Sequence, residues 1–195
     1  MASLFDTLQA NAFRAGIRTR TKESQAWFKR NVTNLQVSPT SILKDKALDK
    51  TSQNIRGSMY MYFYDPKHKE TLPYYDRFPL TIMVDGAPGG FYGLNLHYLS
   101  PAVRARFLDE LMKLGPKNMN DTTRLQRMRY KTLKGVTKYK EFKPCFKHYL
   151  MNHVESRMVR VPMTEWSIAI FLPTEQFKKK GKSAVWADSN KIIRG

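Results

Sequence analysis

The chemistry most visible in this sequence is phosphate binding. The 195 residues contain 34 Lys and Arg against 16 Asp and Glu, a formal net charge of +18. Such an excess destabilises a compact state by self-repulsion unless an anionic partner offsets it. Lys and Arg neutralise phosphate without reading base sequence. The candidate DNA or anion contacts are Arg14, Arg18, Arg20, Lys22, Lys29, Arg30, Arg124, Arg127, Arg129, Lys131, Lys178, Lys179 and Lys180.

A second candidate surface is the aromatic segment 73–80, PYYDRFPL. Tyr74 and Tyr75 offer ring faces, and Asp76 and Arg77 follow them directly with opposite charges. Aromatic rings of this kind stack on nucleobases or dock on a partner protein. The alternative is a loop that packs on its own domain. The packing loop is the favoured interpretation, and a docking patch made of these four residues is the functional alternative.

Residue patterns for catalysis or metal binding are missing from the sequence. Cys145 is the single cysteine, which excludes an intramolecular disulfide and a cysteine-based zinc site. The glycine-rich segment 86–90 lacks the Lys-Ser/Thr pair of a phosphate-binding loop, and the four histidines form no metal motif. No apolar run approaches the roughly 20 residues of a membrane span. We therefore expect no enzyme activity, metal, cofactor or membrane partner.

Strands must supply the core that positions these residues. Three apolar, aromatic runs bounded by Pro and Gly predict strands over 59–64, 78–84 and 91–99. Two further strands are expected over 157–161 and 166–172. In the third run, alternation favours Tyr92, Leu94, Leu96 and Tyr98 as the core face, with His97 on the opposite face. A small, strongly bent sheet or barrel follows from these runs.

Helices are expected around this sheet. Helical spacing indicates a short helix over 3–15, and Ser100-Pro101 begins another that ends near Leu114. Apolar residues three to four apart make the basic segment 122–147 helical as well, and a short helix is expected from Pro173. We predict a basic N-terminal arm with short helices over 1–55 and a barrel domain over 56–195, into which a basic helical segment, 117–153, is inserted.

Distinctive short segments along residues 56–190 indicate a relationship to a protein family. GSMYMYFYDPK, LPYYDRFPLTIMV and GGFYGLNLHYL are followed by RARFLDEL, EWSIAIFLPTEQF and VWADS. Together they resemble a virion-associated protein of large contractile-tailed phages of the T-even type and their cyanophage relatives. The resemblance implies a DNA-end or head-completion role, or a tail or baseplate role. The strand pattern is also similar to the SH3-like barrel of PemK-type toxin nucleases.

The sequence thus predicts an α+β protein with a small SH3-like barrel and peripheral helices. Its expected function is that of a non-enzymatic structural or assembly protein of a phage virion, assembled in the host cytoplasm. Its expected partners are other virion proteins, in a multi-copy assembly, and double-stranded DNA bound without sequence specificity. Two alternatives stay open: a PemK-like endoribonuclease, and a protein-docking module of a tail or baseplate whose basic surface meets an acidic partner.

Overall fold

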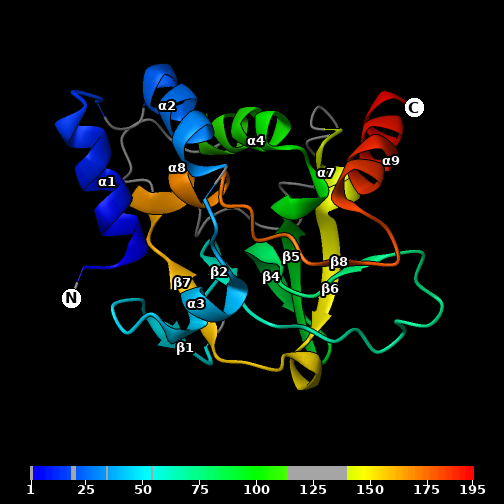
Figure 1. Cartoon of the computed structure of the whole chain (residues 1–195). Helices are drawn as coiled ribbons and strands as arrows, with labels where there is room; N and C mark the ends of the chain where they lie inside the picture. Colours follow the sequence, from blue (N-terminus) through cyan, green and yellow to red (C-terminus); the bar gives the residue numbers. More distant parts are fainter. Residues whose placement is uncertain (1, 19–20, 34, 54, 114–139) are drawn as a thin grey trace.

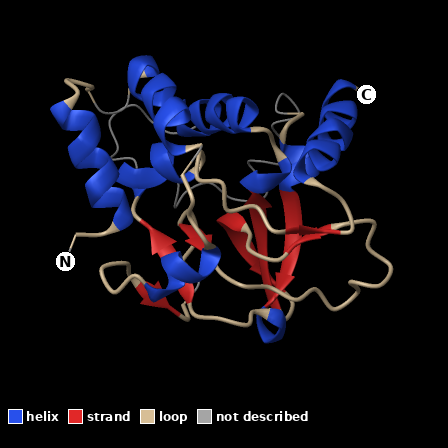
Figure 2. Ribbon diagram, in the orientation of Figure 1, coloured by secondary structure: helices blue, strands red, loops and turns tan. Residues whose placement is uncertain are grey.

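The computed structural model of the chain is an α+β fold, and it describes residues 2–18, 21–33, 35–53, 55–113 and 140–195 (Figures 1 and 2). Its α-helices are α1 Leu4–Arg14, α2 Lys22–Val32, α3 Pro39–Lys44, α4 Pro101–Lys113, α7 Phe142–Cys145, α8 Trp166–Ala169 and α9 Lys182–Arg194. The 3-10 turns are η1 Leu96–Tyr98, η2 Met151–His153 and η3 Met163–Glu165. The strands are β1 Lys50–Thr51, β2 Met59–Met61, β3 Tyr75–Asp76, β4 Leu80–Ala87, β5 Gly90–Asn95, β6 Phe146–Leu150, β7 Met158–Val161 and β8 Phe177–Lys178.

Six of the strands form one antiparallel sheet in the order β1-β7-β2-β4-β5-β6, and β3 pairs with β8 apart from it. The edge strands β1 and β6 lie at opposite ends of this order, so the sheet is open. The structure therefore corrects the expected closed barrel, and the SH3-like prediction is not confirmed. One reason is that residues 166–172, expected as a strand, contribute none to the sheet.

Both faces of the sheet are buried. Alternation along β2 places Met59 and Met61 in the main core cluster and Tyr60 in a separate aromatic cluster with Tyr62 and Tyr149. Most helices lie on one side of the sheet (Figures 1 and 2). Five apolar residues of the predicted strands lie in the main cluster, and Phe63 packs against it; the five are Ile82, Leu94, Leu96, Ile168 and Ile170.

The N-terminal helices share this main core. Ser3 caps α1 through a capping box with Asp6, and Thr21 caps α2 in the same way with Ser24. Phe5 of α1 and Phe28 of α2 are almost completely buried in the main cluster. The division of the chain into a basic arm and a barrel domain stays a prediction, although the two parts contribute side chains to one cluster.

The structure corrects three predicted elements in the second half of the chain. The run 166–172 begins as the short helix α8, because a continuous buried apolar run fits a buried helix as well as a strand. The segment from Pro173 is extended and leads into β8, and the tail forms α9 instead. The third predicted strand ends at Asn95, and η1 follows it.

The basic segment is described only in its last part. Residues 114–139, and with them Arg124, Arg127, Arg129 and Lys131, lie outside the described residues. Residues 140–153 form α7, β6 and η2 rather than the single helical segment that we expected. β6 pairs closely with β5: a Cβ on Gly90 would lie 1.8 Å from the Tyr149 carbonyl oxygen, so this position excludes every other residue.

Candidate nucleic-acid interface

A pocket of about 380 Å³ lies between β6, η1 and the loop that precedes β3. Its walls come from segments far apart in the chain, and most of its side chains are aromatic or apolar. The lining residues are Tyr64, Pro66, Leu72, Pro73, Tyr74, Tyr75, Asp76, Tyr98, Phe146, Lys147, His148 and Tyr149. Three residues of the predicted docking patch therefore line one pocket, together with β6 residues that we had not selected.

The aromatic wall of this pocket is held by ring contacts. The ring centroids of Tyr74 and Tyr98 are 5.9 Å apart, and Phe177 packs edge-on against Tyr98 with a centroid distance of 5.3 Å. The neighbouring ring of Tyr149 lies 4.9 Å from Tyr64. Because the rings fix one another, the pocket is lined with flat apolar surfaces in set orientations.

Lys147 is the cation of the pocket. Its pairing with Gly93 of β5 fixes its position on β6, and its Nζ lies 4.1 Å from the Tyr98 ring centroid. Burial lowers the pKa of Lys147, and no carboxylate in the described part of the chain lies within ion-pair distance of it. The pocket therefore contains a half-buried positive charge that has no counter-ion among the described residues.

Asp76 lies under the pocket in a fully bonded site. One carboxylate oxygen, Oδ2, accepts from His97 Nδ1 at 2.7 Å and from the Asn95 side chain at 3.1 Å. The other, Oδ1, accepts from the backbone N–H groups of Phe78 and Gln176. Burial by itself raises the pKa of Asp76, but the ion pair and these hydrogen bonds outweigh it and hold the pKa below its ordinary value.

The groups around Asp76 follow one another in the order of a catalytic triad, but a substrate has no access to them. The Thr174 hydroxyl lies 3.3 Å from His97 Nε2, so hydroxyl, imidazole and carboxylate follow one another as in some hydrolases. Both Thr174 and His97 are 0% exposed, which leaves no path for a substrate. Sequence reasoning missed this group because its members are 21 and 77 residues apart. It joins β3, η1 and the 174–176 segment.

Arg104 extends the buried network. Its guanidinium donates to the carbonyls of Leu99 and Ile170 at 2.7 and 3.0 Å and pairs with Glu175. The side chain is completely buried, and the pair with Glu175 helps to hold the pKa of that carboxyl below its ordinary value against the effect of burial. Arg104 therefore serves the interior of the fold and is not available to an external anion.

The last docking candidate, Arg77, points to a different set of partners. It pairs with Asp65 at 2.9 Å and with Glu155 at 2.7 Å. Asp76 and Arg77, adjacent in sequence, thus have separate ion-pair partners. Of the four predicted docking residues, the half-buried rings of Tyr74 and Tyr75 are the two that carry exposed aromatic surface into the pocket.

Three predicted cations lie in β8 or directly after it, and two of them bind other groups within the protein. Lys179 has a positive φ of 69°, and its Nζ donates to the carbonyls of Lys69, Glu70 and Leu72 at 2.6 to 2.9 Å. Lys180 pairs with Asp188 at 2.7 Å and lies over the Tyr74 ring. Lys178 is exposed, and it makes no ion pair within the described part of the chain.

The predicted cations of α1, of α2 and of the segment between them have a different environment. They are exposed, and none makes an ion pair with the residues the structure describes; they are Arg14, Arg18, Lys22, Lys29 and Arg30. Lys29 and Arg30 line a shallow hollow with Ala26 and Thr33 on α2. Arg20 lies outside the described residues. The exposed cations of α2, which are Lys22, Lys29 and Arg30, form a surface that we call the α2 face. Its positive charge has no ion-pair partner among the described residues and is available to an anionic surface.

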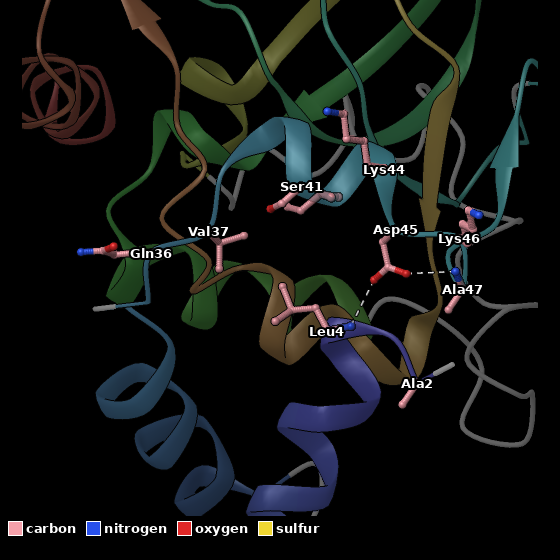
Figure 3. A pocket seen from close by; sticks show the side chains of 10 residues that line it. Ala2, Leu4, Gln36, Val37, Ser41, Lys44, Asp45, Lys46 and Ala47 are labelled. Atoms are coloured by element: carbon pink, nitrogen blue, oxygen red, sulfur yellow. Dashed lines mark hydrogen bonds between the residues drawn. The ribbon is translucent and has the colours of Figure 1, made fainter.

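A larger pocket of about 670 Å³ lies where the start of α1 meets α3 (Figure 3). Asp45 holds this junction, since its carboxylate accepts from the backbone N–H groups of Leu4 at 3.2 Å and Ala47 at 2.9 Å. The remaining walls are mostly short or aliphatic side chains, without an aromatic ring. Its polar centre thus docks the N-terminal helix, and although Lys44 and Lys46 add positive charge, the lining offers no ring on which a base could stack.

The described ranges also lack a cluster of metal ligands and a membrane-spanning helix. There, no three His, Cys, Asp or Glu side chains lie close enough together to bind a metal ion. Within the same ranges, no helix has the length and apolar character needed to cross a membrane. Burial raises the pKa of the Cys145 thiol to about 12, which makes it unreactive at neutral pH.

Comparison with known proteins relates the chain to a protein family. The model of a family described as "Phage T4 terminal DNA protecting protein" matches residues 6–192, nearly the whole chain. No curated protein and no solved structure matches. The match includes α1 and α2, which the resemblance to residues 56–190 had not covered.

Proposed function

We propose, because the chain belongs to the phage T4 terminal DNA protecting protein family, that it binds the ends of double-stranded phage DNA as a structural protein of the virion. In this proposal it assembles in the host cytoplasm, in several copies and next to other virion proteins. The binding is independent of base sequence and requires no catalysis.

The free charge of the α2 face carries this proposal. Lys22, Lys29 and Arg30 are exposed and have no ion pair with the described residues, so they can exchange solvent counter-ions for DNA phosphates. Arg14 and Arg18 extend the same charge toward α1. We include Arg20, Arg124, Arg127, Arg129 and Lys131 as further candidate contacts on the sequence alone.

A non-enzymatic role is supported by the interior of the fold. The one hydroxyl–imidazole–carboxylate series that we find among the described residues is sealed from solvent. The open sheet also gives no support to a PemK-like endoribonuclease. The family description names protection of DNA, which a bound protein provides by covering the terminus.

A gel-shift titration with a linear duplex at 50 and 200 mM salt tests the proposal. If about six to eight phosphates are neutralised, the slope of log affinity against log salt is roughly −5 to −7. Binding that is insensitive to salt, or no binding at 50 mM salt, would contradict it. Cleavage of RNA in the same preparation would favour the endoribonuclease instead.

A further inference from the structure

The aromatic pocket contains an unusual combination, a half-buried lysine without a counter-ion. Burial of a cation costs free energy unless an anion or hydrogen-bond partner compensates. The Tyr98 ring face offers Lys147 partial compensation at 4.1 Å, but no carboxylate in the described ranges does so. A residue that is costly for folding and points into an open pocket is typical of a ligand contact.

We propose that this pocket receives the terminal nucleotide of a DNA strand, with the base on the aromatic wall and a phosphate at Lys147. The inference rests on the proposed function and adds the site at which an end is recognised. The half-buried rings of Tyr74 and Tyr75 provide the stacking surface. His148, exposed at the opening, provides a second polar group for the phosphate or sugar.

The size of the pocket selects one nucleotide. At about 380 Å³ it lies near the lower end of the range of small-molecule sites, roughly 300–1,000 Å³, and is too small for a base pair within a duplex. An internal base can enter only after it leaves the stack on both sides, which costs free energy. The free-energy cost is lower for a terminal base, because it has only one stacking neighbour. The pocket therefore discriminates ends from internal duplex.

Two internal contacts hold the rim in place. Beneath it, Asp76 fixes β3 through the bond to His97. Above it, Lys179 binds three carbonyls of the loop 69–72, next to lining residues Leu72 and Pro73. The rings thus keep their positions before a ligand arrives, which lowers the entropy lost on binding.

The test compares a linear duplex with the same duplex closed by a hairpin loop at each end. Wild-type protein should bind the linear form roughly tenfold more tightly at equal salt, as expected for one stacked base. Lys147→Gln and Tyr74→Ala should each remove most of this preference and leave the affinity for the closed form unchanged. Lys143→Gln, an exposed lysine of the neighbouring α7, is the matched control and should keep the preference.

The two proposals fail differently in this experiment. Equal, salt-sensitive affinity of wild-type protein for both forms would overturn the pocket assignment and leave duplex binding intact. Absence of binding to either form would overturn the proposed function, and a titration with deoxyadenosine 5′-monophosphate, followed by tyrosine fluorescence, then decides the pocket. A fluorescence change that Lys147→Gln abolishes supports it, and no change at millimolar nucleotide overturns it. Lys147→Gln should fold, because it removes an uncompensated buried charge.

Discussion

Two basic regions of this protein have the same appearance in sequence and different roles in the fold. On the α2 face, Lys22, Lys29 and Arg30 have no ion-pair partner among the described residues. Near β8, Lys179 binds three backbone carbonyls and Lys180 binds Asp188. A cation that already has partners must give them up before it binds phosphate. We therefore propose that the availability of charge, rather than its density, identifies the DNA-binding surface of this protein.

The most engaged cation, Arg104, should show the largest effect on stability. Arg104→Met leaves the carboxylate of Glu175 buried without its partner and removes the bonds to Leu99 and Ile170. We expect urea unfolding to show a loss of about 3–5 kcal/mol in the free energy of unfolding. Arg106→Met is the control, because this exposed arginine pairs with Glu141 at the surface, and its loss should be below about 1 kcal/mol. Equal losses for the two variants would contradict the account.

The same comparison between paired and unpaired groups applies to two buried carboxylates, and here the effect on stability depends on pH. Glu175 is paired, whereas Glu165 has a buried oxygen without a partner, and burial together with Asp6 and Asp45 raises its pKa to about 7. A folded-state pKa above the ordinary value of 4.5 means that ionisation of Glu165 costs stability as pH rises from about 4.5 to 7.

Glu165→Gln should therefore stabilise the protein by about 1–2 kcal/mol at pH 8, with little effect at pH 4, when solvent screening is allowed for. Thermal unfolding at the two pH values measures the difference. Glu155→Gln is the control, since this exposed residue pairs with Arg77 at the surface. An equal change in melting temperature at both pH values for Glu165→Gln would exclude the pKa shift as the cause.

A smaller loss of stability is expected at Lys179. Lys179→Met removes the three hydrogen bonds to the loop 69–72, and because the side chain is exposed we expect a loss of about 1 kcal/mol. Lys178→Met, at the adjacent exposed position, should change the unfolding free energy by less than about 0.5 kcal/mol. Indistinguishable unfolding curves for the two variants would show that Lys179 does not hold the loop.

The sequence predicted the elements whose patterns are local. β2 and β7 fall within expected apolar runs, β4 and β5 overlap two others, and α4 begins at Pro101 as expected. β6 was not predicted, because Lys147 and His148 interrupt its apolar residues inside a segment where basic charge and helical spacing dominated. α8 was mistaken for a strand, since a short buried run carries no decisive period.

Some residues of the candidate site could likewise be selected from the sequence, and others could not. Tyr74 and Tyr75 could be selected from the sequence because aromatic residues next to a turn are visible there. Lys147 could not, because its significance depends on the missing counter-ion and on the Tyr98 ring 49 positions earlier. Likewise, the engagement of Lys179 depends on carbonyls more than 100 residues away in the chain. Long-range pairing decides which charged groups are free.

The salt dependence of duplex binding tests the central claim most directly, namely that cations without internal partners bind the DNA. The variant Lys22→Ala/Lys29→Ala/Arg30→Ala should lose no more than about 0.5 kcal/mol of stability, while the slope of log affinity against log salt decreases in magnitude by about 2 to 3. The variant Lys179→Met/Lys180→Met, measured while folded, should keep the wild-type slope. A slope unchanged in the first variant and reduced in the second would contradict the account.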